Sequence, residues 1–158
     1  MKEFTPAPDS ASIVSVTDRV KPVTLGMGVT SVHFLGDRAA FVGGEENVAF
    51  VDDKGQISTV AVHSGGILST AGDGKRLVMG GDDGKVVALD AKGEVTLLAT
   101  DPKRRWIDAV ALHPDGAYAW SAGKFAFVKS GKNEEKVRSA TLTAFSVSSV
   151  LDLISSHI

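Results

Sequence analysis

The histidines are the first side chains in this sequence that are able to do chemistry. His33, His63 and His113 lie far apart, at positions that do not correspond to one another, so we expect no shared metal site. His63 is a candidate ligand or general base. The competing interpretation is structural: its ring bonds within the fold, and Asp83 is the partner that we expect for it.

The aspartates next to glycine or lysine are the second group. The pairs Asp52-Asp53 and Asp82-Asp83 lack the alternating oxygen donors and the distant glutamate of a helix–loop–helix calcium site. An aspartate in a turn accepts hydrogen bonds from backbone amides two or more residues further on. We therefore interpret these pairs as turn residues, together with Asp73 and Asp115, each of which precedes a glycine.

Motifs for phosphate binding and nucleophilic catalysis are missing from the sequence. A phosphate-binding loop needs a glycine five residues before its Gly-Lys pair. The pair Gly84-Lys85 has Met79 at that position, and the pair Gly123-Lys124 has Tyr118. No Gly-x-Ser-x-Gly elbow is present. The sequence therefore predicts no catalytic residue, no metal and no cofactor.

One local feature predicts a binding role. Lys103, Arg104 and Arg105 are three consecutive cations that end on Trp106, in a segment that joins two apolar runs. Arginine and tryptophan are enriched at interface hot spots, and cations beside an aromatic ring suit an acidic peptide or a phosphate. The alternative is a solvated basic turn in which Trp106 covers the edge of the neighbouring strands.

The elements that must position these residues are short strands. Between residues 63 and 90, apolar runs alternate with Asp-Gly turns, which is the strongest short-range signal of β-hairpins. The plan repeats: Gly44, Gly81 and Gly123 align at spacings of 37 and 42 residues. The expected strands are 30–35, 39–43, 48–52, 56–63, 67–71, 76–80, 86–90, 94–100, 107–113, 117–122 and 125–130.

Residues 63–90 resemble the WD-repeat family. His63 occupies the histidine position of that pattern, Asp73-Gly74-Lys75 and Asp83 match its two turns, and Leu89-Asp90 stands where the family has Trp-Asp. The resemblance implies an all-β fold of the β-propeller type, built from four-stranded antiparallel blades. It also implies a protein partner and no cofactor.

The same resemblance implies a hydrogen-bonded tetrad within the blade. His63 and Asp83 supply two of its members, but Met79 stands in place of a serine and Leu89 in place of a tryptophan. The tetrad-like and turn residues that we expect to be structural are His63, Asp73, Asp83, Asp90 and Asp115.

We divide the chain into a disordered leader (residues 1–10), propeller blades (11–138) and an atypical serine-rich tail (139–158). The three blades span residues 29–62, 63–105 and 106–138, and a strand over 11–20 is expected to complete a last blade. The tail has no glycine or proline. It is either a final strand over 141–150 or the product of a truncated or frame-shifted reading frame.

Three blades make an incomplete ring, because propellers close with about four to eight. We expect self-association, blades from another chain, or a longer protein. The net charge of −2 gives no overall attraction to nucleic acid or to an anionic membrane. The absence of cysteine excludes disulfide bonds. No signal peptide or membrane helix is evident, so a cytoplasmic location is expected.

The sequence thus favours a non-enzymatic, WD-repeat-like scaffold that binds protein partners. One alternative is a propeller enzyme or cofactor-binding protein, similar to a quinoprotein or a lactonase, for which Asp108 is the clearest acidic residue on an inner strand. The other is a truncated gene product with no role of its own.

Overall fold

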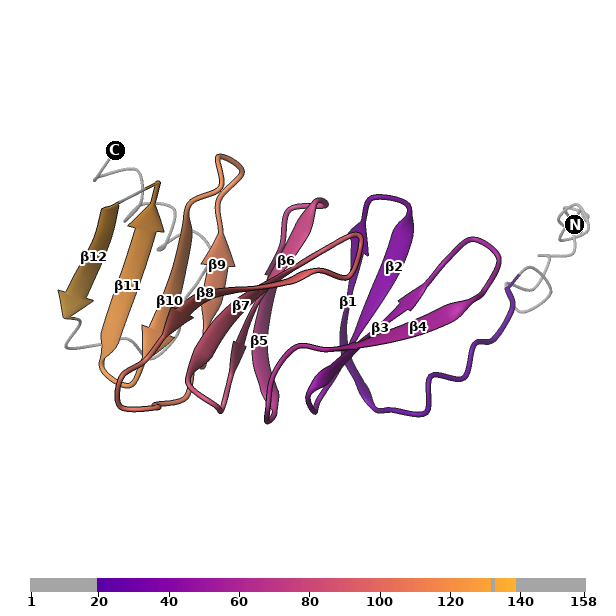
Figure 1. Cartoon of the computed structure of the whole chain (residues 1–158), viewed down its shortest axis with the longest axis horizontal. Coiled ribbons are helices and arrows are strands. Elements are labelled where there is room, and N and C mark those ends of the chain that lie inside the picture. The colour runs from indigo at the N-terminus through magenta and orange to yellow at the C-terminus, as the bar shows by residue number, and fades with distance from the viewer. Residues whose placement is uncertain (1–19, 132, 139–158) are drawn as a thin grey trace, which may run out of the picture.

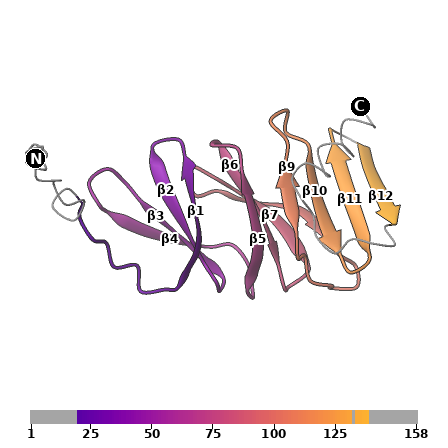
Figure 2. The same ribbon diagram turned by 180° about the vertical axis from the view of Figure 1, so that it is seen from behind.

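The chain is all-β. The computed structural model describes residues 20–131 and 133–138, with side chains up to Gly131. These residues form three four-stranded antiparallel sheets, which follow one another along the molecule (Figures 1 and 2). Each sheet is a meander, in which consecutive strands are hydrogen-bonded neighbours.

We call the sheets the first, second and third blade. The first contains β1 (Val29–Leu35), β2 (Arg38–Gly43), β3 (Asn47–Val51) and β4 (Ile57–Ala61). The second contains β5 (Ile67–Gly72), β6 (Arg76–Gly81), β7 (Lys85–Asp90) and β8 (Val95–Thr100). The third contains β9 (Val110–Leu112), β10 (Tyr118–Ala122), β11 (Phe125–Ser130) and β12 (Asn133–Arg138).

The first two blades are repeats with a spacing of 38 residues. Val29 pairs with Gly43 in the first blade, and Ile67 pairs with Gly81 in the second. A register shift follows both pairs, at Val29/Ser31 and at Ile67/Ser69. The sequence alignment of Gly44 with Gly81 was therefore wrong by one residue, because Gly44 lies in the turn after β2 and corresponds to Asp82.

Aspartates fix the turns between strands, as predicted. The Asp52 carboxylate accepts hydrogen bonds from the Lys54 and Gln56 amides at 3.0 and 2.8 Å. Asp90 accepts from the Lys92 and Glu94 amides at 2.9 and 2.8 Å, in the equivalent turn of the second blade. Each carboxylate accepts hydrogen bonds from two turn amides that have no partner in a neighbouring strand. The connection between two strands therefore needs only a few residues.

The hydrophobic core lies between the blades. The cluster between the first and second blades contains Leu35, Ala40, Val42, Val48, Phe50, Val62, Ile67, Leu77, Met79, Val87 and Leu89. The cluster between the second and third contains Val78, Val86, Ala88, Ile107, Tyr118, Trp120 and Ala122. Each sheet is thus buried on the faces that meet a neighbour, which is how a repeat architecture forms a continuous core.

Trp120 is a core residue, as predicted. It is 4% exposed and stacks on Phe127, with the ring centroids 5.1 Å apart. Neighbouring blades approach most closely through their first strands, with β1 beside β5 and β5 beside β9. The fourth strands β4 and β8 are mostly exposed. The first strand of each blade is therefore the innermost strand.

Two predictions for the third blade were wrong. The strand expected over 107–113 is limited to β9, because the Ile107 amide bonds to the carbonyl of Gly81 in the second blade rather than to a neighbouring strand. A fourth strand, β12, was not predicted, since its sequence NEEKVR has no apolar alternation. The predicted leader, the strand over 11–20 except Val20, and the tail over 139–158 lie outside the described residues; Val20 is not in a strand.

Candidate partner-binding rim

The basic run lies in the connection from β8 to β9, which is built around Asp101. This side chain is buried, and its carboxylate accepts hydrogen bonds from the amides of Lys103 and Arg105, both at 3.0 Å. The Arg105 guanidinium also donates to it, with Nε 3.2 Å from each carboxylate oxygen. This charge-assisted bonding from Arg105 is the main reason that the pKa of Asp101 lies below its usual value.

Arg105 is part of the framework of this connection. Its hydrogen bond to Asp101 raises the pKa of the guanidinium, which also lies over the Phe125 ring at 5.2 Å from the centroid. The sequence predicted Arg105 as a partner-binding residue together with Lys103, Arg104 and Trp106. In the structure Arg105 differs from the other two cations, because it alone of the three has an ion-pair partner among the described residues. Its charge is paired with that of Asp101, and its role in partner binding stays a prediction.

Two backbone hydrogen bonds hold the connection against the second blade. The Asp101 amide donates to the carbonyl of Gly84 at 2.8 Å, and the Ile107 amide donates to that of Gly81 at 3.1 Å. The Ile107 side chain is fully buried. A Cβ atom on Gly84 would lie 2.8 Å from Arg104 Cα, so the loop rests on a position that only glycine can occupy.

Lys103, Arg104 and Trp106 are exposed, and we call these three residues the rim patch. Both cations are exposed, and neither has an ion-pair partner among the described residues. Trp106 is 61% exposed. Arg104 has a φ of 52°, and no other non-glycine residue in the described chain has a positive φ. Such strain is a feature of binding and catalytic sites.

Lys124 lies in a turn next to this connection and was not predicted as a site residue. It lies beside Gly123 in the β10–β11 turn and is exposed. A Cβ atom on Gly123 would lie 3.3 Å from Arg105 Cδ, which shows that this turn packs against the β8–β9 connection. The signal in the sequence was an isolated Gly-Lys pair, and only the fold brings it close to the basic run.

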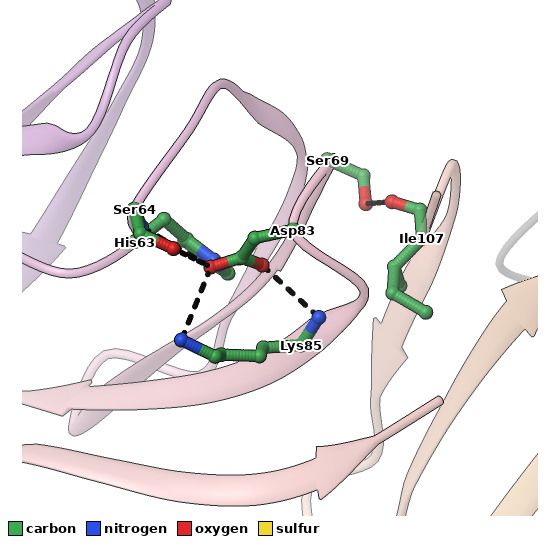
Figure 3. A network of polar contacts seen from close by, with 6 residues as sticks. All are labelled: His63, Ser64, Ser69, Asp83, Lys85 and Ile107. Atoms are coloured by element: carbon green, nitrogen blue, oxygen red, sulfur yellow. Dashed lines mark hydrogen bonds and ion pairs between the residues drawn. The ribbon is translucent and has the colours of Figure 1, made fainter. Parts of the chain in front are cut away.

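His63 and Asp83 form the contact that the sequence predicted (Figure 3). His63 Nδ1 is 3.0 Å from Asp83 Oδ1, and the Ser64 amide and hydroxyl both donate to Oδ2 at 3.1 Å. The Lys85 amide donates to Oδ1 at 3.0 Å. Burial of Asp83 opposes ionisation, but the hydrogen bonds from Ser64, His63 and Lys85 outweigh it and lower the pKa to about 2.

The other half of the tetrad is apolar. Met79 and Leu89 are fully buried in the core between the first two blades. His63 Nε2 consequently has no hydrogen-bond partner in the described part of the chain, and the side chain is 0% exposed. His63 therefore connects the loop before β5 to the β6–β7 turn, and its ring is out of reach of a ligand.

The remaining predicted turn residues lie at the opposite rim. This rim carries the turn between the first and second strands of each blade and the turn between the third and fourth strands. Asp73 accepts from the Lys75 and Arg76 amides, both at 2.8 Å. Asp115 accepts from the Ala117 amide at 2.8 Å, and Asp90 forms the turn described above. Backbone hydrogen bonds contribute to a lowered pKa at all three carboxyls. They form separate turns and no common site.

Polar side chains also meet on the innermost strands. His33 Nε2 is 3.0 Å from Thr70 Oγ1, and Ser31 Oγ is 3.2 Å from the same atom. Burial lowers the pKa of His33. Asp108, predicted to lie on an inner strand, is instead in the loop before β9 and exposed.

Metal sites and membrane-spanning helices are both absent from the residues that the structure describes. Within 20–131 and 133–138, no three His, Cys, Asp or Glu side chains are grouped so as to hold a metal ion. None of the described elements is a helix with the length and apolar character needed to cross a membrane.

The fold is that of β-propeller proteins. No family model and no curated protein matches the chain. Among solved structures it is similar to virginiamycin B lyase from Staphylococcus aureus, with a TM-score of 0.59 and 10% identity, over 75% of this chain and 43% of the lyase. A streptogramin B lyase structure gives a TM-score of 0.59 and 11% identity, over 75% of this chain and 44% of that one.

A third similar structure is the β-propeller domain of Cps50 (Swd1) from Myceliophteria thermophila, with a TM-score of 0.55 and 17% identity. The match covers 75% of this chain and 41% of that domain. The chain therefore spans less than half the length of these propellers. At these low sequence identities the similarity shows the fold alone. The similar structures include two lyases and the Cps50 (Swd1) domain, which is a protein of another kind.

Proposed function

We propose that this chain is a non-enzymatic, WD-repeat-like scaffold, and that its rim patch binds an acidic segment of a partner protein. The observation that carries the proposal is the construction of the β8–β9 connection. Asp101, Arg105 and Ile107 fix its backbone, while Lys103, Arg104 and Trp106 remain free and exposed. A binding surface that is ordered before the partner arrives loses less entropy on association.

The chemistry of the rim patch selects the partner. Lys103 and Arg104 have uncompensated charge, whereas the charge of Arg105 is paired with Asp101. Trp106 offers a flat apolar surface beside the two cations. Carboxylates of a partner would pair with the cations, and an apolar side chain next to them would pack on the indole ring. An acidic peptide with one apolar residue meets both requirements.

The test is selection of binders from a displayed library of acidic peptides, followed by titration of the best one. We expect Trp106→Ala to weaken binding about tenfold or more, since tryptophan at an interface centre contributes about 2 kcal/mol or more. The double variant Lys103→Glu with Arg104→Glu should abolish binding. Affinity for the native chain should fall as the salt concentration rises.

The matched control is the double variant Lys54→Glu with Lys92→Glu, which reverses two charges in the β3–β4 and β7–β8 turns at the opposite rim. It leaves binding unchanged if the rim patch is the site. A selected peptide that binds this control and the rim variant equally well would overturn the proposal, as would a library that yields no binder.

A propeller enzyme is the second candidate, supported by the polar cluster of His33, Ser31 and Thr70 on the innermost strands. A histidine whose pKa is lowered is largely neutral at pH 7 and able to accept a proton. Two of the similar structures are lyases, so virginiamycin B is the natural probe. Its consumption by the native chain but not by His33→Gln supports an enzyme, and an unchanged antibiotic supports the scaffold.

The proposal keeps two predictions from the sequence. The partner is a protein rather than a nucleic acid or a membrane, since the net charge is −2. A cytoplasmic location stays a prediction from the sequence.

A further inference from the structure

The two junctions between blades are filled differently. The 38-residue repeat shows which residues of the first two blades correspond. Leu35 and Phe50 of the first blade are fully buried in the first junction. Their counterparts 38 residues later are Asp73 and Ala88; Ala88 lies in the second junction and Asp73 in the turn after β5. The second blade therefore has a methyl group and a carboxylate where the first blade has a phenyl ring and a leucine side chain.

Lys129 of the third blade is a further difference. It pairs with Tyr118 across β10 and β11, as Leu89 pairs with Leu77 across β6 and β7. Tyr118 and Leu77 both pack on the preceding blade, and residues that pair across two strands share a face. Lys129 therefore stands in the second junction where fully buried Leu89 stands in the first. Lysine is almost never fully buried unless it is paired, so this end of the second junction stays open to water.

A cavity lies between the second and third blades at this place, and we call it the junction cavity. Its volume is about 580 Å³, which is a usual size for a small-molecule site. The β5–β6 turn, the β9–β10 turn and the end of β11 form its walls. A smaller cavity of about 240 Å³ shares Arg76 with it and is lined by Ala88. The charged residues along the junction cavity are Asp73, Lys75, Arg76, Asp115 and Lys129.

The two carboxylates of the junction cavity are already engaged by groups close to them in the chain. Asp73 accepts hydrogen bonds from two turn amides at 2.8 Å, and its Oδ2 lies 3.6 Å from Arg76 Nε. Asp115 accepts a hydrogen bond from the Ala117 amide at 2.8 Å, and its Oδ1 lies 2.8 Å from His113 Nδ1. Neither carboxylate therefore needs a ligand as its partner.

The cations of the junction cavity are less fully engaged. Arg76 Nη2 donates to the Gly116 carbonyl at 2.6 Å. Lys129 is half-buried and Lys75 is exposed, and neither has an ion-pair partner among the described residues. Three cations against two carboxylates give the cavity a net positive charge. A half-buried ammonium group without a counter-charge favours an anion, because a charged hydrogen bond offsets the cost of its desolvation.

We propose that the junction cavity binds a small molecule through an anionic oxygen group, either a carboxylate or a phosphate, and that Lys129 holds this group. Pro114, Ala117 and Tyr118 also line the cavity and offer apolar contacts to the rest of the molecule. The cavity opens at the rim opposite to the rim patch. The proposal is therefore independent of the proposed function.

The experiment titrates the full chain with inorganic phosphate and, separately, with acetate, at constant ionic strength. Amide NMR chemical shifts report the binding. We expect saturable shifts at the amides of Lys75, Gly116 and Ser130, which line the junction cavity. Lys129→Leu should weaken binding about tenfold or more, because it removes a charge-assisted hydrogen bond. Whichever of the two anions binds more tightly identifies the group that the site prefers.

Two further variants make the test specific. Lys54→Leu is the matched control, because it makes the same substitution in the exposed β3–β4 turn of the first blade, outside the cavity; it should leave binding unchanged. Lys129→Leu should fold, since leucine is the residue at the corresponding position of the second blade. If its circular dichroism spectrum is nevertheless lost, Lys129→Gln takes its place, with the same loss of affinity expected.

Three results would overturn the proposal. The first is the absence of saturable shifts at the cavity amides with both anions. The second is an unchanged affinity in the folded variant of Lys129. The third is a set of shifts confined to the rim patch, which would show that its exposed cations bind the anions and the junction cavity does not.

Discussion

Asp83 connects the loop before β5 to the β6–β7 turn through one carboxylate. It accepts hydrogen bonds from the loop before β5, through Ser64 and His63, and from the start of β7, through Lys85. The Asp83 side chain is only 9% exposed, so its carboxylate is costly to desolvate. The hydrogen bonds from His63, Ser64 and Lys85 together offset this cost. Removing the acceptor leaves buried donors without partners, which costs more than the bonds contribute.

Replacement of Asp83 by alanine should therefore lower the free energy of unfolding by about 2–3 kcal/mol. Asp52→Ala is the matched control, because Asp52 also accepts from two amides but lies in an exposed turn and contacts no histidine. It should cost less than about 1 kcal/mol. Urea unfolding followed by circular dichroism measures both, and equal losses would contradict a special role for Asp83.

The same carboxyl makes stability depend on pH. Its pKa is lowered from 3.8 to about 2, so the folded state binds its proton less readily than the unfolded state does. The stabilisation is complete above pH about 4 and is lost as the pH falls to about 2, and it amounts to roughly 2 kcal/mol.

Asp83→Asn should remove this contribution. The difference in unfolding free energy between the native chain and the variant should be constant from pH about 7 to about 5 and shrink steadily towards pH 2. Comparing the two proteins cancels the other carboxyls whose pKa is lowered, such as Asp73 and Asp115. A difference that does not change over that range would refute the assignment.

At the scale of elements, the β8–β9 connection depends on the β6–β7 turn beneath it. Gly84 has a φ of +76°, and a Cβ atom there would lie 2.8 Å from Arg104 Cα. Gly74 has a similar φ of +83°, but no atom lies within 4 Å of the position of its Cβ. The two glycines share a conformational requirement and differ in whether another segment packs on them.

Gly74→Ala should destabilise the chain by about 1 kcal/mol, the cost of a left-handed residue, whereas Gly84→Ala should cost about 3 kcal/mol because the loop must also move. Thermal unfolding measures both values. The displaced loop should in addition change the fluorescence of exposed Trp106 in Gly84→Ala but not in Gly74→Ala. Similar effects of the two variants would show that the loop does not rest on Gly84.

How much of this could be read from the sequence depends on the range of the interactions. The turns at Asp73, Asp83 and Asp90 were predictable, because a turn is decided by neighbouring residues. The role of Arg105 was predictable only in part, because it pairs with Asp101 four residues earlier but also lies over Phe125 in the third blade. Likewise the strand expected from Ile107 was interrupted by a bond to the second blade, and β12 pairs with β11 without an apolar pattern of its own.

For the whole molecule, two equivalent arginines connect consecutive blades. Arg38 donates to the carbonyl of Ala91 in the second blade at 2.9 Å, and its guanidinium lies 4.0 Å from the centroid of the Phe50 ring. Arg76, 38 residues later, donates to the carbonyl of Gly116 in the third blade at 2.6 Å. Each junction thus combines an apolar core with one charged hydrogen bond near its edge, and a stack of this kind is stabilised by the sum of its junctions.

Arg38→Ala and Arg76→Ala should each lower the free energy of unfolding by about 1.5–3 kcal/mol, the contribution of a hydrogen bond from a charged group. Because the two side chains act at different junctions, the double variant should show the sum of the single losses within about 0.5 kcal/mol. Arg104→Ala is the control of the same residue type, with an exposed side chain that should cost less than about 0.5 kcal/mol. Denaturant unfolding of the four proteins tests this, and a double variant much less stable than the sum would mean that the two junctions are not independent.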